Sequence, residues 1–383
     1  MAPVATHPSD TGASARVRHM GESLVGLGHE VHFLHLQQTL RADPTAMQRY
    51  WRERLHVFQS LSPASFLGRA RRKAIRLVGK TFHLNLPVDC YFDPEAAAFV
   101  RQLVTEGGFE VAVLSYVFYS RLLEWMPAPV RKLIDTHDVF SDRYRLYRAH
   151  GQANEFFSTG RLEEAKALGR ADAVLAIQEW DAGHFRSLTT RPVAVVGHLA
   201  PVMEGPPAPP ASAPAILFVG GPMGINVHAM TWFTERVLPA VRRRVPEAEL
   251  WLAGGIGARV GPEVAGVRRL GFVDSLGDVY RRAAIVINPQ QFGTGLSIKS
   301  VDALLHGRPL VTTVSGARGL ENGVGTAFRQ ADSADAFAES LIELLGDPAG
   351  AAALAARAGE FARAYHARQV RALADVVREP AAS

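Results

Sequence analysis

The chain alternates short apolar runs with segments whose apolar residues recur at helical spacing. Val17, Met20, Leu24 and Leu27 lie three or four residues apart, which predicts a helix over residues 16–28. Alternating strands and helices are typical of βαβ units and parallel sheets. The other elements predicted in this half are strands at 2–6, 30–36, 109–116, 131–135, 171–177 and 193–199, and helices at 94–106 and 155–169.

A proline-rich segment at residues 206–214 interrupts this pattern and predicts a linker, because it has no apolar periodicity. The alternation then restarts. The elements predicted after the linker are strands at 215–221, 248–255, 267–273, 284–289 and 309–313, and helices at 227–245, 275–282, 297–307, 333–346 and 349–377.

This order of elements predicts an α/β protein with two Rossmann-like, doubly wound domains that face a central cleft. The first domain covers residues 1–205 and the second covers residues 215–360. We expect the C-terminal helix at 361–383 to pack back on the first domain.

Length and composition agree with a globular protein of two domains. The chain has 383 residues, of which 48% are hydrophobic and 21% charged. It has no uninterrupted apolar run long enough for a transmembrane helix, and no leader-like N-terminus. Cys90 is the only cysteine, which excludes an intrachain disulfide and a cysteine-rich zinc site. We therefore expect a cytoplasmic protein.

The net charge of +5 is concentrated in one segment, since eight Lys or Arg residues lie between Arg52 and Lys80. A solvated basic surface is the simplest interpretation. The alternative is peripheral contact of residues 52–80 with anionic lipid on the inner face of a membrane. Nucleic acid is not favoured, because no recognisable binding motif accompanies the charge.

The most informative motif extends from Asn288 to Pro309, where a predicted strand runs through a glycine-rich turn into a helix. Glycines at 293 and 295 allow the backbone to approach a ligand closely. The helix that follows directs N–H groups at such a ligand, and Lys299 adds a positive charge. The pattern predicts a diphosphate site, with Asp302 placed to bind ribose hydroxyls. An ordinary loop with a surface lysine is the alternative; a Walker A loop is excluded, because Ile298 precedes the lysine.

Several segments resemble the GT-B glycosyltransferases of family 4, the group 1 transferases. The donor-site signature of that family is similar to GTGLSIKSVDALLHGRPLVTT (293–313) followed by GARGL (316–320). The resemblance continues in ILFVGG (216–221) and GFVDSLGDVYRRAAIVINP (271–289). It reaches the first half in THPSDTGASARVRHMGESLVGLGHEVHFL (6–34) and IDTHDVFSDR (134–143).

The resemblance implies a hexosyltransferase-like enzyme that binds a nucleotide-diphosphate sugar. Lys299 would neutralise the diphosphate, and Asp302 would hold the ribose at a position where the family usually has Glu. The family also commonly has a Glu at the position of Thr294. The other donor-binding residues implied are Gly12, Gly221, Asn226, Phe272, Val273, Gly293, Thr294, Gly295 and Leu296.

Two polar residues, His137 and Asp138, follow the predicted strand at 131–135 and are the catalytic candidates together with Lys299. A histidine titrates near neutral pH, so it can donate or accept a proton there. One of the pair would contact the sugar and the other would serve as a general base, and the assignment is open. The alternative is that Asp138 caps the next helix.

The predicted reaction moves a sugar from the nucleotide donor to an acceptor hydroxyl, with retention of configuration and without a metal or other cofactor. His184, His198 and His228 are scattered without the spacing of metal ligands. Two alternatives stay open. One is a catalytically inactive GT-B homologue that serves as a nucleotide-binding partner or scaffold. The other is an epimerase acting on a nucleotide sugar.

Overall fold

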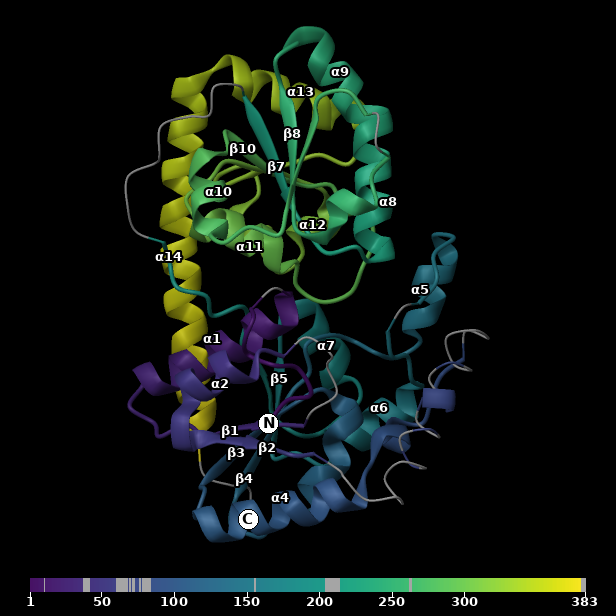
Figure 1. The fold of residues 1–383 in the computed structure, drawn as a ribbon, viewed down its shortest axis with the longest axis vertical. Coiled ribbons are helices and arrows are strands. Elements are labelled where there is room, and N and C mark those ends of the chain that lie inside the picture. The colour runs from purple at the N-terminus through teal and green to yellow at the C-terminus, as the bar shows by residue number, and fades with distance from the viewer. Residues whose placement is uncertain are drawn as a thin grey trace. The chain divides into compact units, whose positions relative to one another are not determined.

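A computed structural model describes most of the chain, and its residues divide into two compact units. The described residues are 1–9, 11–36, 42–59, 68, 70, 73–75, 77, 84–154, 156–203, 214–261 and 264–379. Unit 1 comprises Met1–Leu199 with Gln369–Ser383, and unit 2 comprises Ala200–Arg368 (Figure 1). The proline-rich linker predicted at 206–214 lies outside the described residues except for Pro214, and so does most of the basic segment between residues 60 and 83.

Unit 1 is built on parallel strands. A four-stranded sheet has the order β3 (Val111–Ser115), β4 (Arg131–Asp135), β5 (Ala173–Ala176) and β6 (Val193–Val195). A second pair consists of β1 (Phe33–His35) and β2 (Leu55–Val57). The main helices of unit 1 are α1 (Gly12–Gly26), α2 (Pro44–Trp51), α4 (Pro94–Gly107), α5 (Arg143–Ala149), α6 (Arg161–Leu168) and α7 (Glu179–Arg186), with a 3-10 segment at Val117–Trp125.

The start of the chain connects the two sheets of unit 1. Ala2 forms a parallel bridge to His35, and the carbonyl of Met1 accepts a hydrogen bond of 2.9 Å from the Ser115 N–H. Residues 1 and 2 thus lie between β1 and β3. The strand predicted at 2–6 is therefore shortened to a single bridging residue, because the chain turns away after Ala2.

Unit 2 contains a six-stranded parallel sheet in the order β12-β11-β10-β7-β8-β9. This is the strand order of a doubly wound nucleotide-binding fold, and the order reverses between β7 and β10. The strands are β7 (Ala215–Val219), β8 (Glu249–Ala253), β9 (Val267–Gly271), β10 (Ile285–Asn288), β11 (Leu310–Thr312) and β12 (Arg329–Gln330).

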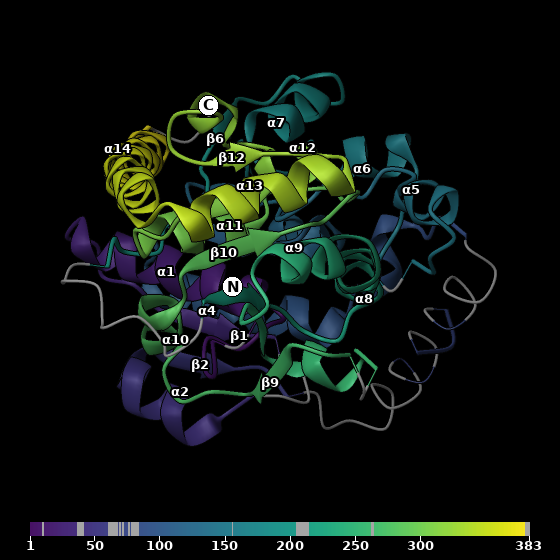
Figure 2. The same ribbon diagram turned by 90° about the horizontal axis from the view of Figure 1, so that it is seen from above.

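Helices accompany this sheet in unit 2, and α13 lies beside α9 (Figure 2). The long helix α14 starts in unit 2 and ends in unit 1. The helices are α8 (Gly224–Trp232), α9 (Leu238–Arg244), α10 (Leu276–Arg282), α11 (Ile298–Leu305), α12 (Val314–Ala317), α13 (Ala334–Gly346) and α14 (Pro348–Arg378), with a π-helical turn at Phe233–Val237.

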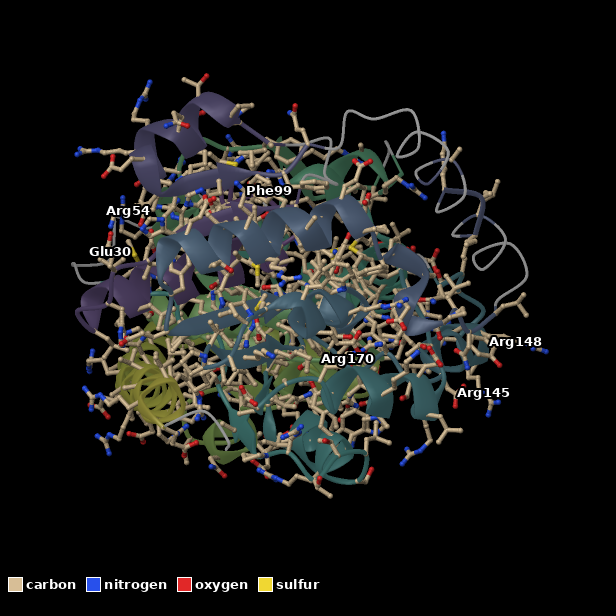
Figure 3. All side chains as sticks on the ribbon, turned by 90° about the horizontal axis from the view of Figure 1, so that it is seen from below. Glu30, Arg54, Phe99, Arg145, Arg148 and Arg170 are labelled. Atoms are coloured by element: carbon tan, nitrogen blue, oxygen red, sulfur yellow. The ribbon has the colours of Figure 1, made fainter. Side chains whose placement is uncertain are left out.

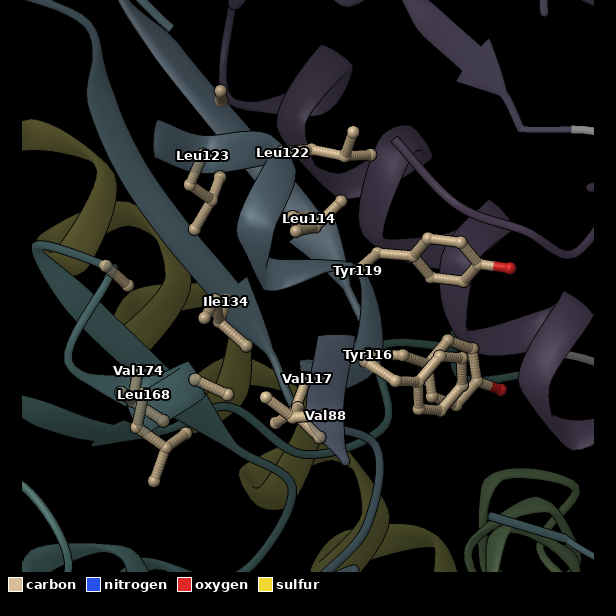
Figure 4. Packing of buried hydrophobic residues seen from close by; sticks show 14 of the residues in the cluster. Val88, Leu114, Tyr116, Val117, Tyr119, Leu122, Leu123, Ile134, Leu168 and Val174 are labelled. Atoms are coloured by element: carbon tan, nitrogen blue, oxygen red, sulfur yellow. The ribbon is translucent and has the colours of Figure 1, made fainter. Parts of the chain in front are cut away.

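Each unit has its own hydrophobic core. In unit 1, side chains of β3, β4 and β5 pack with those of α4 and the segment after β3, and Tyr116 and Tyr119 point in the same direction, away from the aliphatic cluster (Figure 4). In unit 2, β7 is buried almost throughout, which explains why its sequence reads as a continuous apolar run. Arg145 and Arg148 of α5 extend outward as exposed side chains (Figure 3).

Two predicted helices differ from the structure for identifiable reasons. The helix predicted at 155–169 is only Arg161–Leu168, because Thr159 bonds to distant carbonyls, with its N–H on Phe140 and its hydroxyl on Leu86. The helix predicted at 227–245 contains the π-helical turn before Pro239. Proline lacks an N–H and clashes with the carbonyl four residues earlier, so a wider turn accommodates it.

Phe337 should be a large contributor to the stability of unit 2. Its ring is fully buried and lies edge-on to the rings of Trp232 and Phe233. Replacement Phe337→Ala should lower the free energy of unfolding by about 3–5 kcal/mol, because a cavity remains. Urea denaturation followed by circular dichroism measures this. The control Val314→Ala, at a half-exposed site, should change it by less than about 1 kcal/mol; equal losses in the two variants would contradict the prediction.

Candidate functional site

The strand reversal in unit 2 determines where its candidate site lies. In doubly wound sheets, ligands bind beyond the carboxyl ends of the strands, at the point where the strand order reverses. Here the loops at that point follow β7, at residues 220–223, and β10, at residues 289–297. The predicted donor residues Gly221, Gly293 and Lys299 belong to these loops or to the helix that directly follows one of them.

Asn288, the last residue of β10, holds the second loop in place. Its fully buried amide nitrogen donates to the hydroxyls of Ser297 at 2.7 Å and Ser300 at 2.8 Å. Ser300 in turn donates to the carbonyl of Gly316 at 2.7 Å, and Thr312 donates to the carbonyl of Asn288 at 2.9 Å. The strand end, the start of α11 and the segment after β11 are therefore joined by one set of hydrogen bonds.

The turn itself needs its glycines. Gly293 has φ +148° and Gly295 has φ +74°, conformations that residues with a side chain rarely adopt. Arg318 donates to the carbonyl of Gly293 at 2.6 Å, which fixes the turn from a third side. Between these glycines, the Thr294 hydroxyl is buried and has no hydrogen-bond partner among the described residues. A buried polar atom without a partner is unusual and is a place where a ligand can complete the bonding.

Lys299 lies in the first turn of α11, and its ammonium group is turned toward the loop after β7. Its Nζ donates to Oδ1 of Asn226 at 2.9 Å and lies 5.3 Å from the centre of the Phe218 ring. Asn226 is itself oriented by a 3.0 Å bond from its Nδ2 to the carbonyl of Gly221. Burial lowers the pKa of Lys299 to about 8, because the charged form loses hydration. An anion bound here would restore the stability of the charged form.

The remaining predicted donor residues lie at the same edge of the sheet of unit 2 or on α11. Leu296 is buried at the end of the glycine turn. Phe272 and Val273 follow β9; the Phe272 ring is 65% exposed and lies beside Gly255, in the loop after β8. Asp302 is one turn beyond Lys299 on α11. Burial raises the pKa of the nearby Tyr280 hydroxyl, and the charge of Asp302 raises it further.

Gly12, the predicted donor residue of unit 1, is the first residue of α1 and not part of the preceding loop. The helix begins four residues earlier than predicted, because the Thr11 hydroxyl accepts a bond of 3.1 Å from the Ser14 N–H and caps it. Gly12 is exposed there.

His137 in unit 1 lies directly after β4, among charged and aromatic groups. Its Nε2 is 2.9 Å from Oδ2 of Asp135, and its ring stacks on Tyr116 with centres 4.1 Å apart. Asp135 is fully buried, which by itself would raise the pKa of its carboxyl, but the positive charge of the paired Arg16 holds that pKa well below the usual range. His137 and Tyr116 both have positive φ, +61° and +76°.

Asp138 is not a helix cap, contrary to the alternative interpretation of the sequence. The N-cap position of the next helix, α5, is Asp142, and its side chain makes no capping bond. Asp138 accepts a 3.0 Å bond from the Val139 N–H and forms an ion pair with Arg143. The pair raises the pKa of the buried Arg143 guanidinium, and it occupies one of the two oxygens of Asp138.

The sequence did not single out four residues that organise these two places: Asn288, Arg318, Asp135 and Arg16. Arg16 carried a signal, since an arginine on the otherwise buried side of α1 requires a buried partner. Within the described residues, no group of three or more His, Cys, Asp or Glu side chains could hold a metal ion. The helices of the described part of the chain include none that is both long and apolar enough to cross a membrane.

Comparison with known proteins finds a family model and several solved structures that are similar to this chain. Residues 213–347 match the family model described as "Glycosyl transferases group 1". Sucrose-phosphate synthase from Thermosynechococcus elongatus is similar in structure, with a TM-score of 0.68 and 16% identity over 96% of this chain and 93% of that one. Anabaena HepE, in a complex with UDP and glucose, has a TM-score of 0.61 and 13% identity over 96% and 97% of the two chains.

The lipopolysaccharide outer core galactosyltransferase WaaB is also similar, with a TM-score of 0.61 and 12% identity over 98% of this chain and 97% of that one. No curated protein sequence matches the chain. The fold of the chain is the GT-B fold of these glycosyltransferase structures. The part of the chain that is similar to the group 1 family model, residues 213–347, lies in unit 2 and includes the glycine turn and Lys299.

Gly316 should be a sensitive position of the Asn288 network. A Cβ atom added there would lie 2.6 Å from Nδ2 of Asn288 and closer still to the Thr312 hydroxyl. Replacement Gly316→Ala should therefore lower the free energy of unfolding by about 1–3 kcal/mol through overpacking. The matched control is Gly346→Ala, where the added methyl meets nothing within 4 Å. Urea titrations of both variants test this, and a Gly316→Ala variant as stable as the control would show that the network tolerates the methyl group.

Proposed function

We propose that the protein transfers a sugar from a nucleoside-diphosphate sugar to a hydroxyl of an acceptor. The observation that carries this proposal is the placement of Lys299, which is buried, oriented by Asn226 and located at the strand reversal of unit 2. The diphosphate would accept hydrogen bonds from the backbone of residues 293–296 and pair with Lys299. Solved complexes of similar structures contain UDP, which makes a uridine nucleotide the first donor to test.

In the proposed reaction, the bond between the anomeric carbon and the diphosphate oxygen breaks, and the acceptor oxygen forms the new bond on the same face of the sugar. The acceptor proton passes to the departing diphosphate, so configuration is retained and no metal or other cofactor takes part. Charge grows on the diphosphate as the bond breaks. A positive group fixed beforehand at that place stabilises the transition state more than the ground state.

We assign further roles to residues on the same basis. Phe272 and Val273 would bind the base, Asp302 the ribose, and Gly221 would keep Asn226 oriented. The buried Thr294 hydroxyl would contact the transferred sugar, because it has no partner among the described residues. In unit 1, His137 would contact a hydroxyl of the sugar or of the acceptor. Asp138 is the weaker catalytic candidate, because Arg143 already pairs with one of its oxygens.

Removing the Lys299 charge should weaken nucleotide binding. Replacement Lys299→Met keeps the volume of the side chain, and it should lower UDP affinity roughly 10- to 100-fold, since hydrogen bonds to charged groups contribute about 1.5–3 kcal/mol. Because the pKa of Lys299 is about 8, UDP affinity of the unmodified protein should fall as the pH rises above 8. In the variant that fall should be absent.

Isothermal titration calorimetry with UDP between pH 7 and about pH 10 measures both effects. The matched control is Lys166→Met in unit 1, which removes one lysine charge at a half-exposed site and should leave UDP affinity unchanged. Unchanged UDP binding by Lys299→Met would remove the basis of the proposed donor site.

A catalytically inactive homologue and an epimerase are the two competing functions. The family match and the similar glycosyltransferase structures do not favour the inactive homologue. Slow release of free glucose from UDP-glucose would separate a transferase from a nucleotide-binding scaffold. Conversion of the donor to another nucleotide sugar, without any acceptor, would instead identify an epimerase.

We further propose that residues 52–80 bring the protein to anionic lipid on the cytoplasmic side of a membrane. The support is the density of Lys and Arg in the sequence. Each basic residue near such a surface contributes about 1 kcal/mol, so removing three charges should weaken binding by more than roughly 100-fold.

The test compares sedimentation with phosphatidylcholine vesicles that contain or lack phosphatidylglycerol. Replacement of Arg71, Arg72 and Lys73 by Gln should abolish binding to the anionic vesicles at physiological salt. The control replaces Arg242, Arg243 and Arg244 at the end of α9 by Gln, which removes the same charge elsewhere. Equal losses in both variants would mean that net charge, and not this segment, governs binding.

A further inference from the structure

Asp135 and Arg16 form a buried ion pair that the reaction outlined above does not use. Asp135 ends β4 and Arg16 lies on α1, and their exposed fractions are 0% and 1%. The Nε of Arg16 is 3.0 Å from each carboxylate oxygen, and its Nη2 is 2.5 Å from Oδ1. This two-pronged geometry fixes the plane of the carboxylate as well as its position.

The same carboxylate contacts the imidazole of His137. Its Oδ2 lies 2.9 Å from Nε2 of the ring, although the N–H direction is not aligned for a regular hydrogen bond. The ring of Tyr116 also restricts the imidazole. The two rings stack with their centres 4.1 Å apart and an angle of 20° between their planes. His137 is therefore held by a charge at one edge and by an aromatic ring on one face.

The backbone at both stacked residues is in the left-handed region. Such conformations are unfavourable for residues with a side chain, and they persist where the surroundings determine them. His137 has φ +61° and Tyr116 has φ +76°, at the ends of the adjacent strands β4 and β3. Both stacked residues have strained backbones and lie next to a buried ion pair. We infer that the surrounding structure fixes the position of the imidazole.

The guanidinium of Arg16 also donates to backbone carbonyls near Leu199, where the chain leaves unit 1. Its Nη1 donates to the carbonyl of Gly197 at 2.7 Å, and its Nη2 donates to that of Val196 at 2.8 Å. The N–H of Gly197 donates to Oε1 of Gln369 at 2.7 Å, and Gln369 is the residue at which the chain returns to unit 1. Arg16 thus joins both crossing points of the chain to the carboxylate that contacts His137.

Stability alone is a poor reason for this pair. Buried ion pairs lose so much hydration that apolar residues of similar volume often stabilise a protein as well or better. We propose that Asp135, held by Arg16, is a positioning residue for His137 in sugar transfer, which rests on the function proposed above for His137. The carboxylate favours a proton on Nε2, so Nδ1 is the nitrogen that accepts a hydrogen bond from a substrate hydroxyl.

The first test observes the imidazole directly and needs no substrate. Long-range nitrogen–proton spectra of protein labelled at histidine distinguish the two tautomers, and the His137→Gln variant identifies the His137 signals. We expect the Nε2–H tautomer in the unmodified protein and a mixture of tautomers in Asp135→Asn. His137 signals that are the same in both proteins would overturn the proposal.

A control separates positioning from general destabilisation. Asp89 pairs with Arg170 and Lys166 in unit 1, away from His137 along the chain, and it is also largely buried; Figure 3 marks Arg170. Asp89→Asn should lower stability without changing the His137 signals. Should Asp135→Asn fail to fold, the paired variant Arg16→Met with Asp135→Leu removes both charges together and provides the same measurement.

The second test measures UDP release from UDP-glucose. Misplacing a group by about 1 Å can cost roughly 100-fold, so Asp135→Asn should lower kcat by up to about that factor while UDP affinity is unchanged. In the His137→Gln background the same change should have no further effect, because Asp135 acts through the imidazole. An equal, independent loss in that background would overturn the positioning role. Full activity of His137→Gln, or no UDP release by the unmodified protein, would instead contradict the proposed function, and the spectra would still decide the role of Asp135.

Discussion

The hydrogen bonds of the Asn288 side chain are the constraint on which the candidate site of unit 2 depends. A parallel strand delivers its last residue to the edge of the sheet, but it does not determine the path of the chain beyond that point. Asn288 determines that path by binding Ser297 and Ser300 across the loop. These bonds hold the start of α11 next to the end of β10. Lys299, in the first turn of α11, then contacts Asn226 and the ring of Phe218. The glycine turn, the helix start and the lysine are consequences of one buried amide.

The buried charges of the two units have different partners: Asp135 in unit 1 has a partner of opposite charge, and Lys299 in unit 2 contacts neutral groups. In unit 1 the carboxylate of Asp135 is neutralised by Arg16, and the carbonyls of Val196 and Gly197 accept further hydrogen bonds from the guanidinium. In unit 2 the contacts of Lys299 are the neutral amide of Asn226 and the ring of Phe218. Burial therefore lowers the pKa of Lys299 with no opposing cause, whereas the pKa of Asp135 is held down. A positive group kept in that condition is suited to an anionic ligand, and a neutralised pair is suited to holding a neighbour in place.

Sequence reasoning succeeded where local pattern determines structure. Parallel strands buried on both faces read as apolar runs, so β4 was predicted at its observed bounds and the strands at the reversal, β7 and β10, were predicted within two residues at each end. The glycine turn and Lys299 were predicted because their chemistry is contained in one short segment. Asn288 and Asp135 were not singled out, because their roles come from partners outside their own strands: Ser297 and Ser300 for Asn288, and Arg16 for Asp135. The helix predicted at 155–169 was too long for the same reason, since bonds to Phe140 and Leu86 override local propensity.

The similar structures share only 12–16% identity with this chain over almost its whole length. Parallel sheets tolerate such divergence, because any apolar residues of suitable volume can fill a buried strand. A site does not tolerate it in the same way, because it depends on particular atoms at particular distances. Thr294 illustrates the difference. The turn around it depends on backbone that Gly293 and Gly295 alone supply, whereas its buried hydroxyl has no partner among the described residues and is a group whose chemistry the fold does not determine. The fold therefore fixes the strand reversal and the glycine turn, and a few side chains such as Thr294 would determine which ligand fits beside them.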